Sequence, residues 1–141
     1  MEALHLLGDP VLIPTAVINE IQQRGSSDPA VQVLGQTNWL QSVDPGGPPP
    51  VLASWPLGPG ETAVLTHAIA NPETEVIVDD RTARKCATAL AVPKRGTVAL
   101  ILLAKQQALI PLARPVLEEL RKHGMFLSDR AMNQALALVG E

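Results

Sequence analysis

The chain has 141 residues, a formal net charge of −3, a single cysteine and only three aromatic residues, two Trp and one Phe. This length suits one domain, expected over 1–141, whereas the lone Cys86 excludes an internal disulfide and a cysteine zinc cluster, and the scarcity of aromatic rings disfavours a surface that stacks single-stranded bases. The longest apolar stretch, 97–104, is far shorter than the roughly 20 residues that span a bilayer, and no secretory signal pattern is present, so we expect a cytoplasmic chain with no membrane partner.

In chain order, short apolar strands alternate with helical patterns, and a loop rich in proline and glycine separates the first five elements from the rest. We expect a helical stub over 2–7 closed by a turn at 8–10, a strand over 11–13, helices over 15–24 and 29–36, a strand over 39–43, the loop over 44–60, a helix over 61–70, a strand over 76–78, a helix over 81–90, a short strand at 92–93, and helices over 97–109, 112–123 and 129–139. This alternation predicts the α/β class, with a mostly parallel sheet and helices on both of its faces.

Two adjacent aspartates, Asp79 and Asp80, follow the β-branched strand over 76–78. In an open α/β sheet, ligands bind just outside the carboxyl ends of the strands, so this position is suited to a metal site. The alternative is structural, because Asp80 directly precedes a helix and Asp is a preferred N-cap residue. Thr97 and Ser128 are expected to cap their helices in the same way.

Two further acids belong to the same hypothesis. Glu20 flanks the apolar stripe of the helix expected over 15–24, and Glu61 lies in the first turn of the helix expected over 61–70. Each has a structural alternative, and for Glu61 it is a favourable interaction with the helix dipole. Carboxylates packed together repel one another unless a cation neutralises them. Oxygen ligands of this kind suit Mg²⁺ or Mn²⁺, and such ions can promote phosphodiester hydrolysis.

Basic residues are concentrated between 81 and 122, which contains nine of the eleven Lys and Arg and a net charge of +7, against −10 for the remainder. Such an asymmetry is compatible with a carboxylate site beside a phosphate-attracting surface, or simply with solvated helix faces. Arg81, Arg84 and Lys85 are the candidates for substrate binding.

Four motifs in register resemble the PIN-like nucleases, in particular the prokaryotic subgroup related to VapC toxins. They are Pro14-Thr15-Ala16-Val17-Ile18-Asn19-Glu20-Ile21, Gly58-Pro59-Gly60-Glu61-Thr62-Ala63-Val64-Leu65, Val78-Asp79-Asp80-Arg81-Thr82-Ala83-Arg84, and a tail that includes Gly96-Thr97-Val98 and Leu109-Ile110-Pro111. The resemblance implies a three-layer α/β/α fold, a Mg²⁺- or Mn²⁺-dependent ribonuclease, RNA as substrate and an antitoxin-like partner. It assigns the metal to Glu20, Glu61 and the aspartate pair, with Asp79 as the preferred ligand and Asp80 as the cap. In the related toxins the acid that corresponds to Glu61 often lies near position 62 or 63.

The resemblance also has a gap, because such proteins normally begin with a strand that ends in a catalytic aspartate, and no segment here matches it. An upstream start, a degenerate non-catalytic relative and a second subunit that fills the gap are the three explanations. An alternative function is therefore an inactive PIN-like scaffold that acts through protein–protein interaction. The helix over 97–109 is apolar around its whole circumference, which is typical of a core helix or of an oligomer interface.

Overall fold

The computed structural model describes residues 10–141, which form two compact units, Pro10–Arg95 and Gly96–Glu141. The helical stub and most of the turn expected over 2–10 lie outside the described residues. Among residues 10–141, no helix is both long enough and apolar enough to cross a membrane.

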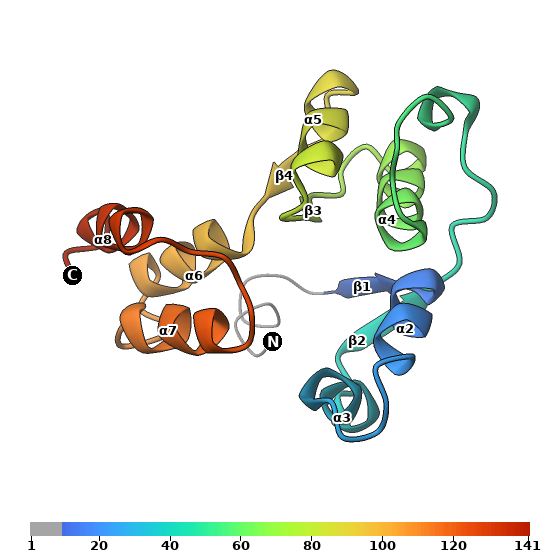
Figure 1. The fold of residues 1–141 in the computed structure, drawn as a ribbon. Coiled ribbons are helices and arrows are strands. Elements are labelled where there is room, and N and C mark those ends of the chain that lie inside the picture. Colours follow the sequence, from blue (N-terminus) through green and yellow to red (C-terminus); the bar gives the residue numbers. More distant parts are fainter. Residues whose placement is uncertain (1–9) are drawn as a thin grey trace. The chain divides into compact units, whose positions relative to one another are not determined.

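The first unit contains two separate pairs of parallel strands. Strand β1 (Val11–Pro14) pairs with β2 (Leu40–Val43), and β3 (Val76–Ile77) pairs with β4 (Lys94–Arg95). The α/β class and the parallel pairing are confirmed, but the described strands form two sheets where we expected one. The helices of this unit are α2 (Thr15–Gln22), α3 (Pro29–Gln36), α4 (Pro59–Ala70) and α5 (Arg81–Ala89), with a 3₁₀ turn, η1 (Pro50–Leu52), inside the long loop (Figure 1).

Helix α4 is central to the first unit, because it contacts α2, β1 and β3. The buried core lies around it and on the α5 side: Leu52, Leu65, Ala68, Val76, Val78, Ala83, Cys86, Ala87 and Val92. By contrast, α2 and α3 contain no fully buried residue. Their half-buried apolar stripes follow the helical period, as expected for helices that cover one face only.

The helix starts follow their local capping chemistry. Asp28 caps α3 by accepting a hydrogen bond from the Ala30 N–H at 2.8 Å. Helix α4 begins at Pro59, two residues earlier than predicted, because proline at the first helical position fits the helix and has no N–H to leave unpaired. Thr97, expected as a cap, is instead the first residue of α6, and Gly96 occupies the cap position.

Two helices end earlier than predicted because an alanine adopts a left-handed conformation just beyond each of them. Ala91 (φ 55°) follows α5 and Ala108 (φ 58°) follows α6. This geometry is normally supplied by glycine, so the sequence offered no stop signal. After Ala91, the N–H of Val92 donates to the carbonyl of Ala87 at 2.8 Å. The strand expected at 92–93 is therefore wrong by two residues, and pairing is observed at Lys94–Arg95.

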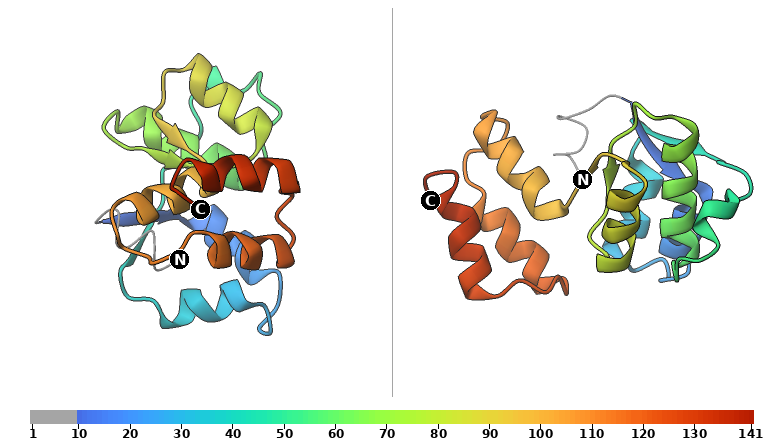
Figure 2. Two further views of the ribbon diagram at one scale, coloured as in Figure 1. Left: turned by 90° about the vertical axis from the view of Figure 1, so that its left-hand side faces the viewer. Right: turned by 90° about the horizontal axis from the view of Figure 1, so that it is seen from above.

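The second unit consists of α6 (Thr97–Gln106), α7 (Arg114–Lys122) and α8 (Asp129–Ala137), grouped together in Figure 2. Its core is Ile101, Leu102, Ala113, Leu117, Met132, Ala135 and Leu136. The apolar composition of α6 is explained in large part by burial within the chain, since Leu100, Ile101, Leu102 and Ala104 are all buried. Ser128 caps α8 through the Ala131 N–H, as predicted.

The start of α7 is capped by a residue that is distant in sequence. Its N-cap, Ala113, has no side-chain acceptor. The carboxylate of Glu141 accepts hydrogen bonds from the Ala113 N–H at 2.6 Å and from the Arg114 N–H at 3.2 Å. The bond from Ala113 holds the pKa of Glu141 below its ordinary value of 4.5. Glu141 therefore ties the end of the second unit to the start of α7.

Replacing Glu141 by Ala should lower the melting temperature of the chain near neutral pH. A carboxyl whose pKa is depressed by folding stabilises the folded state above its unfolded pKa, and this contribution is lost as the pH falls through the folded pKa. The difference in melting temperature between wild type and Glu141→Ala, followed by circular dichroism, should thus be largest near pH 7 and vanish in acid. Glu118→Ala, an exposed charge on α7, is the control, and an equal loss in both variants would contradict this role.

Candidate functional site

Glu20 joins α2 to the start of α4. Its Oε1 accepts a hydrogen bond from the backbone N–H of Gly60 at 2.9 Å, across 40 positions of sequence. The two helices are in contact, and α4 lies directly above α2 in Figure 1. The position of Glu20 on the edge of the apolar stripe of α2 allows the side chain to reach the neighbouring helix, although the residue as a whole is exposed.

Glu61 lies in the same first turn of α4 and is half-buried. Its Oε2 is 2.7 Å from the point where a Cβ on Gly58 would be, and the Oε2 of Glu20 is 2.6 Å from the corresponding point on Gly60. Both carboxylates thus pack against backbone that lacks side chains. The start of a helix carries partial positive charge, which favours nearby anions. The structure therefore brings Glu20 and Glu61 to one helix terminus.

The two aspartates lie at the end of β3, and both are exposed. Asp80 Oδ2 accepts a hydrogen bond from the Ala83 N–H at 2.9 Å and caps α5. Asp79 directly follows Val78, whose N–H is bonded to the carbonyl of Arg95 at 3.0 Å. Asp79 therefore stands just beyond the last strand hydrogen bond, at the carboxyl end of a parallel pair.

The acids provide only oxygen donors, which is the chemistry that Mg²⁺ and Mn²⁺ prefer. Among residues 10–141, however, no group of three or more acidic, histidine or cysteine side chains is close enough to hold a metal ion. The side chains of Glu20 and Glu61 both lie at the start of α4, against Gly60 and Gly58 respectively, whereas Asp79 and Asp80 do not complete a cluster with them. The described residues thus offer the type of ligand atom that such a cation prefers, but too few of these ligands come together to surround it.

Three basic side chains were predicted to bind substrate, and all three lie on α5. Arg84 is half-buried, and its Nη1 donates to the carbonyl of Val78 at 3.1 Å. This bond holds the guanidinium at the end of β3, one residue from Asp79. Arg81 and Lys85 are exposed and lie one helical turn apart. The positive charge of α5 is therefore adjacent in sequence and in space to the strand end that carries the aspartates.

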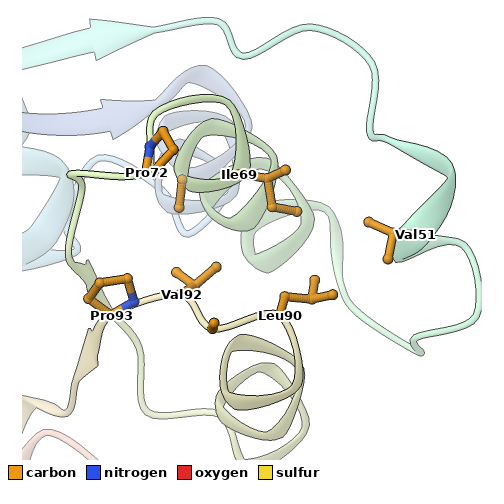
Figure 3. Close-up of a pocket in the computed structure, with 8 residues that line it drawn as sticks. Val51, Ile69, Pro72, Leu90, Val92 and Pro93 are labelled. Carbon is orange, nitrogen blue, oxygen red and sulfur yellow. The ribbon is translucent and has the colours of Figure 1, made fainter.

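A pocket of about 210 Å³ is present elsewhere in the first unit (Figure 3). Its lining residues are Val51, Ala68, Ile69, Pro72, Leu90, Ala91, Val92 and Pro93. None of these side chains is charged or a hydrogen-bond donor, so the pocket offers no group for acid–base or metal chemistry. It contains none of the predicted site residues.

The sequence interpretation missed the role of the two glycines that precede and follow Pro59. Gly58 and Gly60 had been assigned to the loop, whereas they form the cap and second helical position of α4, against the two glutamates. The available signal was the tripeptide Gly-Pro-Gly directly before an acid. Glycine destabilises a helix, so its presence in a first helical turn indicates that a neighbouring group occupies the space of its missing side chain.

Asp80→Ala should destabilise the chain by about 1 kcal/mol, because replacing an N-cap Asp by Ala typically costs roughly 0.5–2 kcal/mol. Asp80→Asn should leave stability nearly unchanged, since Asn caps a helix as well as Asp does. Urea unfolding monitored by circular dichroism measures both. Equal loss in the two variants would show that the negative charge of Asp80, and not its capping hydrogen bond, is what the fold requires.

The model of a family described as a PIN domain matches residues 1–141, the whole chain. No curated protein and no solved structure matches it.

Proposed function

Since the chain belongs to the PIN domain family, we propose that it is a nuclease whose substrate is RNA and whose activity depends on Mg²⁺ or Mn²⁺. The observation that carries the proposal is the convergence of Glu20 and Glu61 on the first turn of α4. Helix α4 also contacts β3, whose carboxyl end leads to Asp79. One helix thus links all the elements that supply the candidate ligands.

In this proposal Glu20, Glu61 and Asp79 hold the cation, and Asp80 shapes the strand end as the cap of α5. A bound divalent ion supplies activation of water and stabilisation of the leaving oxygen in phosphodiester hydrolysis. The contribution of Arg81, Arg84 and Lys85 is electrostatic: they attract the phosphates of the RNA to the edge at which the acids lie.

We further propose that the site needs one more carboxylate than residues 10–141 bring together. The two parallel pairs support this, because β1 and β3 belong to different sheets and yet both contact α4. One more parallel strand between β1 and β3 would join the pairs into one sheet. A carboxylate at its end would lie at the same edge as Asp79, since the ends of parallel strands meet there.

Asp79→Asn should weaken Mn²⁺ binding at least tenfold, as judged by calorimetric titration, and should abolish Mn²⁺-stimulated RNA cleavage. The physical reason is that the neutral amide removes the charge that balances the cation. Glu73→Gln, which neutralises an exposed acid of the same unit, is the matched control and should bind Mn²⁺ like the wild type. Unchanged cleavage in Asp79→Asn would remove Asp79 from the site.

The second candidate function is a non-catalytic scaffold that binds another protein, either an antitoxin-like partner or a second copy of the chain. Phe126 is 95% exposed and Leu138 is 73% exposed, so both apolar side chains are available to contact a partner. Metal binding separates the candidates: a wild-type chain that binds no Mn²⁺ supports the scaffold, and binding lost in Asp79→Asn supports the nuclease.

Replacing Arg81 and Lys85 together by Ala should reduce RNA affinity and its dependence on salt. Each phosphate contact on single-stranded nucleic acid contributes roughly 0.7 to the slope of log K against log salt. The double variant should therefore lose about 1.4 from that slope, measured by fluorescence anisotropy over a salt series. The control, Arg24→Ala with Arg130→Ala, removes the same charge outside 81–122 and should retain the slope; equal losses would contradict a local phosphate surface.

A further inference from the structure

The start of α4 has an unusual distribution of capping groups. Its N-cap is Gly58, which has no side chain that could accept a hydrogen bond. Pro59, at the first helical position, has no N–H, so Gly60 provides the first backbone N–H of the helix. The N–H groups of a first helical turn have no partner within the helix. Here the acceptor comes from another helix, as the Oε1 of Glu20 at 2.9 Å.

Gly60 also leaves the space in which this carboxylate lies. A Cβ on Gly60 would be 2.6 Å from Oε2, 3.1 Å from Cδ and 3.2 Å from Oε1 of Glu20. All three distances are shorter than an ordinary van der Waals contact, and all three involve the same carboxyl group. Gly60 itself is buried, which indicates that Glu20 and its neighbours cover it closely.

We propose that Gly60 is a positioning residue of the candidate metal site. Its N–H orients the carboxylate of Glu20, and its missing side chain admits that carboxylate to the first turn of α4, beside Glu61. The proposal deepens the proposed function and rests on it for the role of Glu20 as a metal ligand. What it adds is that the location of Glu20 is determined by a glycine 40 residues away in the sequence.

A methyl group on Gly60 should displace Glu20 without unfolding the chain. The atoms that it would displace belong to the end of a flexible side chain, so Glu20 can swing away without disturbing the backbone. Alanine is also the better helix former, which offsets part of the lost hydrogen bond. Gly60→Ala should therefore still fold while the carboxylate of Glu20 is displaced.

The first arm of the test is amide hydrogen exchange of the full chain, followed by NMR at fixed pH. The Gly60 N–H should be protected in the wild type, unlike a typical first-turn amide. Glu20→Ala should remove this protection, whereas Glu20→Gln should keep it, because the Gln Oε1 still accepts the hydrogen bond. Exchange at Gly60 that is unaffected by Glu20→Ala would overturn the proposal.

The second arm is Mn²⁺ titration of Gly60→Ala beside Gly35→Ala. Gly35 lies in α3, and no atom would be within 4 Å of an added Cβ, so it is the matched control. Loss of groups that orient metal ligands typically costs 10–100-fold in affinity. We expect a loss in this range for Gly60→Ala, wild-type affinity for Gly35→Ala, and no additional loss from Gly60→Ala in a Glu20→Ala background.

The outcomes distinguish the two hypotheses. If the wild type binds Mn²⁺ and Gly60→Ala binds it equally well, Gly60 does not position a ligand, and this inference is wrong while the proposed function stands. If the wild type binds no Mn²⁺, the proposed function fails, and the exchange rates alone decide whether Gly60 holds Glu20.

Discussion

The hydrogen bond between the carboxylate of Glu20 and the N–H of Gly60 connects the parts of the first unit that are otherwise least tied together. Helices α2 and α3 bury no residue completely, so their attachment depends on the pairing of β1 with β2 and on the contact of α2 with α4. The same bond supplies the capping acceptor that Gly58 lacks. A single carboxylate thus closes a helix terminus and joins two segments of the chain.

This arrangement also concentrates negative charge. Glu20 and Glu61 approach the same helix turn, and two carboxylates at one place repel each other in the absence of a cation. The partial positive charge of the helix start reduces the repulsion, and a divalent ion would remove it. The geometry that stabilises the start of α4 is therefore also the one on which the proposed metal site rests. In the proposed function, the exposed strand end at Asp79 and the basic residues of α5 extend this site toward the phosphates of the substrate.

Much of the fold could be predicted from the sequence because it depends on local interactions. The side chains of Asp28, Asp80 and Ser128 accept hydrogen bonds from N–H groups in the first turn of the helices that follow them. Because these bonds join residues two or three positions apart, they can be predicted from the local sequence. The errors occurred where the local signal was absent or misleading. Ala91 and Ala108 end helices in a conformation that usually marks glycine. The strand at 92–93 was displaced because Val92 bonds back to the preceding helix.

The sequence by itself determined the α/β alternation, the parallel sense of pairing and the identity of the acids, because strand and helix periodicities are local properties of the chain. Only the tertiary structure decided which acids lie at the same helix terminus. The spacing of 40 residues between Glu20 and Gly60 gives no indication of contact, and the packing of α2 on α4 creates it. Likewise, the division of the strands into two pairs depends on which edges find partners in space, and a hydrogen bond between distant backbone groups has no signature in either local sequence.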